Sequence, residues 1–233
     1  MWADVAYVLG CYLLGSVPFM VYMAGWYGLK IEPGEDLHIK IWGKLGARVG
    51  LYGVLFDIIV KGAVPVIFGY FMGFRLATIV SAGVLSVTGQ MWPVFRRFEG
   101  EKGNTVSLGF FSLVTGLHQF FIMWLIFVPA AIGAGMKVLP RLFASDQTRR
   151  ERLDLTNRPS RSLPLGIILG FLMMPLVSGV ARLPLELTIG LGVLVFLIIV
   201  RRLTDKGLID DLKTGGRLRS VLWNRLLYDR SFV

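Results

Sequence analysis

A polar stretch from Gly89 to Gly109 carries residue types that could bind an anion. It reads GQMWPVFRRFEGEKGNTVSLG and holds five charged residues within positions 96–102. Lys102 is followed by Gly103 and Asn104, and another glycine lies two residues before the lysine. Glycine lets backbone N–H groups approach a phosphate, lysine supplies positive charge, and a helix that begins near Asn104 would add further N–H groups. The stretch therefore predicts a phosphate site, with an ordinary turn as the alternative.

Gln90 and the two arginines of this stretch each have two interpretations. Gln90 lies three residues before Pro93, so its side chain could hydrogen-bond a substrate or cap backbone carbonyls that the proline leaves unbonded. Arg96 and Arg97 could contribute to the phosphate site, or they could mark a loop that stays on the cytoplasmic side of a membrane. Gln90 is therefore kept as a substrate-binding candidate beside Lys102.

Asp57 and Lys61 form a second pair of residues that could do chemistry. They are four residues apart within the apolar segment 49–74, so on a helix they share one face and can pair. A charge near the middle of a membrane costs several kcal/mol, which makes such a residue a functional candidate. The alternative is that the two charges neutralise each other inside the bundle and fix how the helices pack.

The composition is that of an integral membrane protein. Of the 233 residues, 55% are hydrophobic and only 17% are charged, and the formal net charge is +10. This charge favours contact with anionic lipid head groups, and no nucleic-acid partner is expected. The single cysteine, Cys11, allows no intrachain disulfide, and His38 and His118 are isolated, so no metal site and no cofactor are predicted.

Apolar segments long enough to cross a bilayer recur along the chain. They are 4–26, 49–74, 76–95, 104–135, 162–180 and 184–200. The first lacks a basic leader and a small-residue cleavage site, so we expect it to be a retained helix. The block 104–135 is too long for one crossing and short for two, with Gly116 as a possible turn.

The distribution of charge resolves this ambiguity. Basic residues are in excess in the segment 27–48, in the 96–103 loop, in the segment 136–161 and in the tail from residue 201. All of these lie on the cytoplasmic side if the N-terminus is outside and the block 104–135 crosses twice, or dips in and returns. The sequence predicts an all-α polytopic bundle of about seven membrane segments, N-terminus out and C-terminus in.

This topology implies one membrane domain followed by a tail. Residues 1–200 form the transmembrane domain, with a basic cytoplasmic insertion at 136–161, and residues 201–233 form a basic cytoplasmic tail. Within the tail, Leu218–Tyr228 has amphipathic character, so we expect this part to lie on the membrane surface.

Four stretches carry a family resemblance. They are YLLGSVPF at Tyr12–Phe19, KGAVPV at Lys61–Val66, GVLSVTGQMWPVFRRFEGEKGNTVSLG at Gly83–Gly109 and SLPLGI at Ser162–Ile167. In order and spacing they resemble the bacterial acyl-phosphate:glycerol-3-phosphate acyltransferases of the PlsY type. The resemblance covers most of the chain apart from an insertion within 136–161.

The resemblance implies a seven-helix membrane enzyme whose active site opens at the cytoplasmic face. Such an enzyme transfers a fatty acyl group from acyl phosphate to the 1-hydroxyl of glycerol 3-phosphate and gives lysophosphatidate, with neither coenzyme A nor a metal. Lys102 and Ser162 match the family residue by residue, which implies that both bind substrate. Without the resemblance, Ser162 is most simply a helix N-cap.

Other polar positions depart from the family pattern. The histidine of the family's Gly-His-x-x-Pro motif is Gln90 here, and one glycine of its Gly-Gly-Lys-Gly loop is Glu101. The first cytoplasmic motif, expected near Pro33–Lys44, has lost its serine and asparagines, and its arginine position falls beside Lys44. Glutamine cannot act as a general base.

The C-terminal motif of the family is also changed. Its Arg-His-x-x-Asn pattern falls on Arg201, Arg202 and Asp205, so the histidine and the asparagine are lost.

Two hypotheses for the function of the protein follow. It is a divergent glycerol-3-phosphate acyltransferase of phospholipid synthesis in the inner (plasma) membrane, or a non-catalytic relative that serves as a lipid-binding or assembly subunit. Six residues are the expected substrate ligands: Lys44, Gln90, Lys102, Gly103, Asn104 and Ser162.

Overall fold

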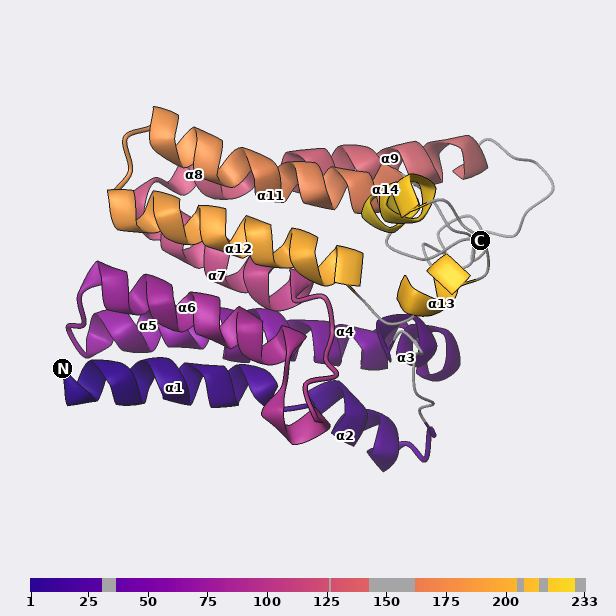
Figure 1. Ribbon diagram of the computed structural model, residues 1–233, viewed down its shortest axis with the longest axis horizontal. Helices are drawn as coiled ribbons and strands as arrows, with labels where there is room; N and C mark the ends of the chain where they lie inside the picture. The colour runs from indigo at the N-terminus through magenta and orange to yellow at the C-terminus, as the bar shows by residue number, and fades with distance from the viewer. Residues whose placement is uncertain (31–36, 126, 143–161, 205–207, 214–217, 229–233) are drawn as a thin grey trace.

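The computed structural model of the chain is a bundle of roughly parallel and antiparallel helices (Figure 1). It describes residues 1–30, 37–125, 127–142, 162–204, 208–213 and 218–228, and these are helices and connecting turns with no strand among them. By length and composition, four of the helices can cross a membrane: Trp2–Trp26, Ala47–Phe71, Leu76–Arg96 and Leu185–Thr204. The predicted all-α membrane fold is confirmed.

The first membrane segment is a broken helix. Helix α1 spans Trp2–Ser16 and α2 spans Phe19–Trp26, with an extended residue, Val17, and Pro18 between them. Proline lacks a backbone N–H group and disfavours a helical conformation in the residue before it. The predicted span 4–26 is therefore helical on both sides of a break.

The segment predicted as a polar loop at 27–48 contains a helix. Helix α3 covers Leu37–Leu45, and α4 begins at Ala47. Leu37 and Ile41, one turn apart on α3, are buried against Met20 and other apolar residues of α2. These two apolar side chains provide the burial that stabilises a short helix in tertiary contact.

The second membrane segment contains a π-helix. Helix α4 (Ala47–Leu55) continues through the π-helix η1 (Phe56–Ala63) into α5 (Val64–Phe71). The wider winding is seen at its end, where the Val64 N–H group donates to the carbonyl oxygen of Ile59, five residues earlier. Short π-segments inside helices occur frequently at functional sites.

The apolar block 104–135 forms helices that run in opposite directions. Helix α6 (Leu76–Met91) and the 3-10 turn η2 (Val94–Arg96) precede α7 (Asn104–His118), and the chain then returns through α8 (Phe120–Leu125) and α9 (Phe127–Leu142) (Figure 1). The break lies at Gln119, which is extended, and not at Gly116, which is helical. The predicted turn position was therefore wrong by three residues.

The last part of the chain adds a helical hairpin and two short helices. Helices α11 (Ser162–Val180) and α12 (Leu185–Thr204) match the predicted spans closely, and α13 (Leu208–Lys213) and α14 (Leu218–Tyr228) follow. Helix α9 extends through 136–142, so the first part of the predicted insertion is helical. Residues 143–161 lie outside the described part.

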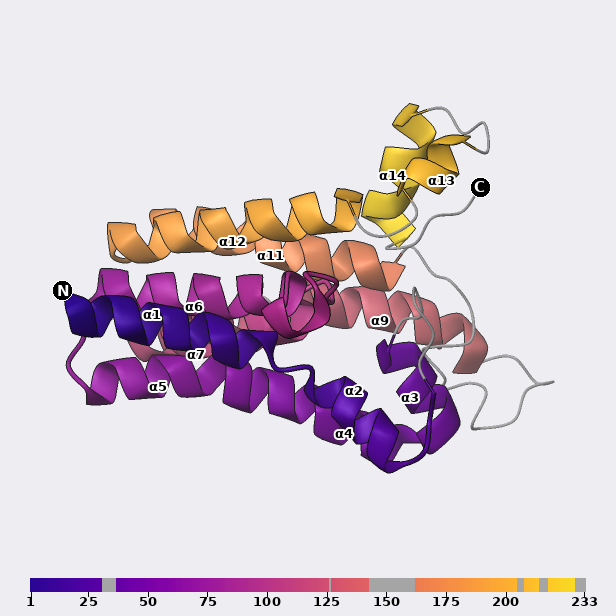
Figure 2. The same ribbon diagram turned by 60° about the horizontal axis from the view of Figure 1, so that its bottom comes forward.

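Figures 1 and 2 show which turns and short helices lie at each end of the bundle. The N-terminus of α1, the α5–α6 turn and the α11–α12 turn lie at one end of the bundle. Helices α2, α3, α13 and α14 lie at the other end, and the connection between α6 and α7 lies toward that same end. The described parts of the basic segments are thus gathered at one end.

Close contact between helix backbones holds the bundle together. The main core consists of buried apolar side chains of α6, α7, α11 and α12, among them Val80, Val87, Phe110, Phe111, Phe171, Leu191 and Leu194. Where η1 meets α7, a Cβ atom on Gly109 would lie 2.0 Å from the carbonyl oxygen of Ile58, and one on Gly62 would lie 2.8 Å from that of Val106. Small residues that let backbones approach are typical of membrane helix interfaces.

We expect Gly109→Ala to destabilise the protein. Its methyl group would overlap the Ile58 backbone, which cannot rotate away, so the loss in unfolding free energy should be about 1–3 kcal/mol, as for other overpacked cores. Thermal unfolding in detergent measures the effect. Gly192→Ala on α12 is the matched control, because a Cβ there meets nothing within 4 Å. Equal midpoints for the two variants would contradict the close approach.

Candidate functional site

The loop that carries Lys102 has an unusual backbone path. Arg97 and Phe98 adopt positive φ values of 52° and 65°, and Gly103, the N-cap residue of α7, has a φ of 75°. Glycine adopts such a conformation without the steric cost that other residues incur. The chain is thereby turned from the end of α6 back into α7 within a few residues.

Arg201 of α12 and the end of α6 hold this loop in place. The Glu101 N–H group donates to the Gln90 carbonyl oxygen at 3.0 Å. Arg201 Nη2 donates to the Gly100 carbonyl oxygen at 2.7 Å and Nε donates to that of Glu101 at 3.3 Å. The Arg201 guanidinium lies 5.7 Å from the ring centre of Trp92, within cation–π range. The two residues before Lys102 are therefore fixed from both sides.

Asp57 and Lys61 form the predicted ion pair inside the bundle. Lys61 Nζ lies 2.9 Å from Asp57 Oδ1, and their side chains are only 4% and 0% exposed. The interpretation that the two charges neutralise each other is confirmed. The pair lies on η1, so the π-helical turn is the element that presents it to α6 and α7.

Gln90 connects this ion pair to the loop. Its Nε2 group shares its two hydrogens among three acceptors, Asp57 Oδ2 at 2.8 Å, Glu101 Oε2 at 3.2 Å and Thr105 Oγ1 at 3.2 Å. Thr105 Oγ1 in turn donates to Asp57 Oδ2 at 3.0 Å. All three acceptors are side-chain oxygens. The Gln90 amide therefore does not cap backbone carbonyls, which was one of its two interpretations. Its Oε1 atom is buried and accepts no hydrogen bond within the described part.

The start of α7 presents polar groups beside Lys102. Gly103 offers no side chain to cap the helix, and the first internal bond runs from the Ser107 N–H group to the Gly103 carbonyl oxygen. Asn104 Oδ1 and Ser107 Oγ are buried and find no hydrogen-bond partner among the described residues. A helix start carries partial positive charge and exposed N–H groups, which suits an anion.

The structure brings together some of the predicted site residues but not all. Gln90 contacts the loop directly, and Lys102, half-buried, is followed at once by Gly103 and Asn104. Lys44 is exposed in the last turn of α3, at the same end of the bundle (Figure 2). Ser162 is the first residue of α11, and its side chain, like the whole of Asp205, lies outside the described part.

Three residues of the site were missed as functional candidates. They are Glu101, Thr105 and Arg201, which the hydrogen bonds above join to Gln90 or to the loop backbone. The sequence alone could have indicated Arg201, because this residue falls on the arginine of the family's C-terminal motif. No sequence pattern indicates Glu101 or Thr105, since their contacts with Gln90 depend on the packing of α6 against the loop and α7.

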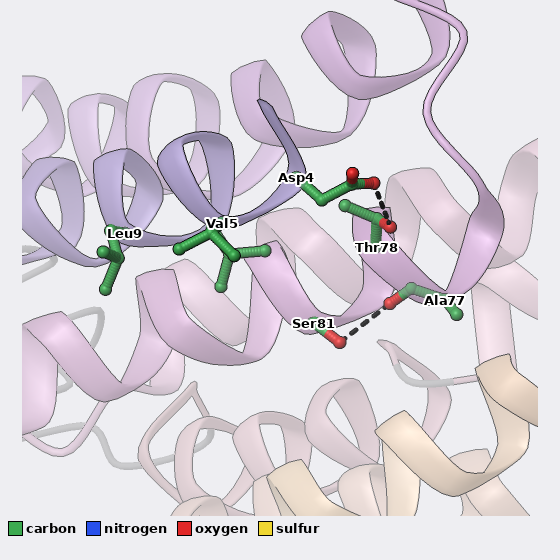
Figure 3. A pocket seen from close by; sticks show the side chains of 7 residues that line it. Asp4, Val5, Leu9, Ala77, Thr78 and Ser81 are labelled. Carbon is green, nitrogen blue, oxygen red and sulfur yellow. Dashed lines mark hydrogen bonds between the residues drawn. The ribbon is translucent and has the colours of Figure 1, made fainter. Parts of the chain in front are cut away.

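A separate hollow lies at the other end of the molecule. A cavity of about 400 Å³ opens between the first turns of α1 and of α6, with Asp4, Thr78 and Ser81 as its polar lining (Figure 3). Asp4 accepts a hydrogen bond from Thr78 at 3.0 Å and pairs with the N-terminal ammonium at 2.9 Å. No lysine, arginine or histidine side chain is among the residues that line this hollow, and its one charged side chain is an aspartate, which would repel a phosphate.

The described residues include no group of three or more histidine, cysteine, aspartate or glutamate side chains that could hold a metal ion. The ionisable groups of the site are instead the buried Asp57–Lys61 pair, Glu101, Lys102 and Arg201. This set can bind an anion and position a hydroxyl group.

The sequence pattern of one protein family, glycerol-3-phosphate acyltransferase, matches residues 5–145. This match covers the first helices, the Asp57–Lys61 pair, Gln90 and the whole Lys102 loop. The chain belongs to the glycerol-3-phosphate acyltransferase family.

Curated members of the family align with part of the chain. A glycerol-3-phosphate acyltransferase of Geotalea daltonii is 30% identical over 120 residues, which is 50% of this chain and 61% of that protein. Glycerol-3-phosphate acyltransferase 5 of Dehalococcoides mccartyi is 28% identical over 175 residues, or 72% of this chain and 61% of its own length. The chain thus spans less than two thirds of the length of each of these relatives.

Two solved structures share the fold. They are the glycerol 3-phosphate form and the lysophosphatidic acid form of PlsY, described as an integral membrane glycerol 3-phosphate acyltransferase. Each superposes with a TM-score of 0.65 at 23% identity and covers 91% of this chain and 93% of the PlsY chain. At this identity the superposition establishes the membrane fold.

We expect Lys61→Met to destabilise the protein strongly. It leaves the Asp57 carboxylate buried without its counter-ion, which typically costs about 3–5 kcal/mol. Asp57→Asn combined with Lys61→Met should recover most of this loss, because asparagine is neutral and keeps an acceptor for Gln90 and Thr105. Unfolding of the purified variants in detergent provides the comparison. A double variant no more stable than the single one would show that the pair is not the source of the effect.

Proposed function

We propose that the protein is a membrane glycerol-3-phosphate acyltransferase. It transfers a fatty acyl group from acyl phosphate to the 1-hydroxyl of glycerol 3-phosphate and releases lysophosphatidate and inorganic phosphate. The observation that carries this proposal is the fixed loop that presents Lys102 at the start of α7, in a membrane bundle of this family.

The phosphate of glycerol 3-phosphate would bind at Lys102 and the first turn of α7. The lysine supplies charge, and the uncapped N–H groups that follow Gly103 supply donors, while Asn104 offers a polar side chain. Lys44 and Ser162, from α3 and α11, are proposed as further ligands. Gln90, which bonds to the loop and to the ion pair, completes the substrate site.

The acyl phosphate needs little chemical activation by the protein. Its mixed anhydride is already reactive, so positioning the two substrates and stabilising the developing charge can supply much of the rate. A cationic loop at the end of apolar helices suits both substrates, acyl phosphate and glycerol 3-phosphate. The acyl chain would lie among apolar side chains and membrane lipid, and the phosphate groups of both substrates would stay at the polar end of the bundle. The reaction as proposed uses neither coenzyme A nor a metal.

The assay of choice follows lysophosphatidate formation from acyl phosphate and glycerol 3-phosphate. Lys102→Ala should lower kcat/KM for glycerol 3-phosphate roughly 10- to 100-fold, because a hydrogen bond to a charged group contributes about 1.5–3 kcal/mol. Arg97→Ala, which removes an exposed positive charge from the same loop, is the matched control and should stay near the native rate. Absence of product from a folded native preparation would refute the proposal and favour a non-catalytic role.

We also propose that this site opens to the cytoplasm, at the inner (plasma) membrane, with the N-terminus of the protein outside. The basic residues support this, since α3, α13, α14 and the Lys102 loop lie at one end of the bundle in Figures 1 and 2. Residues 1–200 would form the membrane domain, with 201–233 as its cytoplasmic tail.

Cysteine labelling tests this orientation. The native Cys11 is buried, so single cysteines placed at the exposed positions Arg48 and Met72 would dominate reaction with a membrane-impermeant maleimide. In intact cells we expect Met72→Cys to react and Arg48→Cys to react only after the membrane is opened. The reverse pattern would place the site outside.

A further inference from the structure

Helix α14 packs across the ends of two long apolar helices. It begins at Leu218, after α12 has ended at Thr204, and it contacts both α11 and α12. In Figure 1 these two helices run across the picture while α14 is seen nearly end-on, and in Figure 2 it lies to one side of α12. The axis of α14 therefore lies across the bundle, at the end where the described parts of the basic segments gather.

The face of α14 that packs on the bundle includes a charged residue. Val221 and Arg225, one turn apart, are both buried, and Arg225 is only 3% exposed. In a helix that faces water, arginines ordinarily point outward and apolar side chains form the inner face. Here a charged side chain occupies part of the inner face, while larger apolar residues of the helix lie outside it.

The outer face of α14 is apolar apart from one arginine. Four residues follow the i, i+3, i+4, i+7 spacing of a single helix face: Arg219, Leu222, Trp223 and Leu226. Trp223 is 60% exposed, Arg219 is exposed, and the two leucines are half-buried. No acidic residue occurs in Leu218–Tyr228. A tryptophan and two leucines beside a cation are typical of a helix that lies in a membrane interface.

We propose that α14 docks on the membrane that the protein spans, with this outer face in the head-group layer of anionic lipid. Trp223 and the two leucines enter the boundary between head groups and acyl chains, where an amphipathic indole ring is favourable. The Arg219 guanidinium pairs with lipid phosphates. This inference goes beyond the proposed acyl transfer and does not depend on it.

The position of α14 identifies lipid as the partner of this face. Helix α12 is long and apolar enough to cross a membrane, and the part of α11 from Leu165 to Val180 is apolar as well. A helix that packs across the ends of these two lies at the level of the lipid head groups. Lipid is present there at high concentration, whereas a soluble partner or a second copy of the chain would have to compete with it.

The charge of α14 suits anionic lipid better than neutral lipid. Arg219 and Arg225 are its charged residues, and of these only Arg219 is exposed. Helix α13 adds no net positive charge, because it carries two aspartates and one lysine. One basic residue near an anionic membrane surface changes the docking equilibrium about fivefold. The response of α14 to anionic lipid therefore depends mainly on Arg219.

A fluorescent label at position 223 tests this docking in the whole protein. Trp223→Cys would be labelled with a polarity-sensitive maleimide dye and reconstituted in vesicles of phosphatidylcholine and phosphatidylglycerol, while the native Cys11 is buried. We expect blue-shifted emission, strong quenching by lipids that carry a nitroxide near the head group, and little quenching by iodide in the water.

Lys30→Cys is the matched control for the dye, since Lys30 is exposed and follows α2 at the same end of the bundle. Its label should be quenched mainly by iodide. A dye that enters the lipid by itself would behave alike at the two positions.

Arg219→Gln in the labelled protein tests the role of charge. In vesicles with phosphatidylglycerol, the ratio of lipid-contacting to water-contacting label should fall about fivefold, because the guanidinium no longer pairs with lipid phosphates. Vesicles of phosphatidylcholine alone should produce a similar fall without this substitution and little further change with it. Arg182→Gln should leave the ratio unchanged, since Arg182 is an exposed arginine in the turn between α11 and α12, at the other end of the bundle.

The same measurements can overturn the proposal. Equal iodide quenching at positions 223 and 30 would place the outer face of α14 in water. Protection of position 223 from both quenchers would show that protein covers this face. Lipid contact that is the same with and without phosphatidylglycerol would remove the preference for anionic lipid. None of these readouts uses lysophosphatidate formation, so a failure of this proposal is distinguishable from a failure of the acyl transfer.

Discussion

The buried ion pair of Asp57 and Lys61 is the constraint on which the rest of the site depends. Isolated charges inside a membrane bundle are costly, and each of these is tolerated because the other lies 2.9 Å away. The remaining acceptor capacity of Asp57 is used by Gln90 of α6 and Thr105 of α7. The pair therefore fixes the relative positions of η1, α6 and α7, and the loop between α6 and α7 is placed as a consequence.

Arg201 connects the loop between α6 and α7 to α12, a late helix of the chain. Its guanidinium connects α12 to the backbone of the Lys102 loop and lies over the ring of Trp92. Because the loop is held by α6, by the ion pair through Gln90 and by α12, the site exists only when early and late helices have packed together. The protein thereby builds a polar site from a small number of charges at the end of an apolar bundle.

Local patterns predicted much of this fold, and long-range contacts account for what they missed. Hydrophobic runs predicted α6 and α12 closely, and the spacing of Asp57 and Lys61 predicted their ion pair. The π-helix left no sequence signal, because an i+4 spacing reads as an ordinary α-helix. The sequence predicts a loop where α3 lies, because the stability of this helix comes from burial against α2 and not from a local pattern. The contact between Gln90 and Glu101 required the three-dimensional path of the loop.

A structure determined with bound glycerol 3-phosphate would test the central claim most directly, because it shows both ends of the substrate at once. The account predicts that the phosphate lies against Lys102 Nζ and the N–H groups at the start of α7, with the hydroxyl end of the substrate toward Gln90. A phosphate bound away from Lys102 and the start of α7 would contradict it.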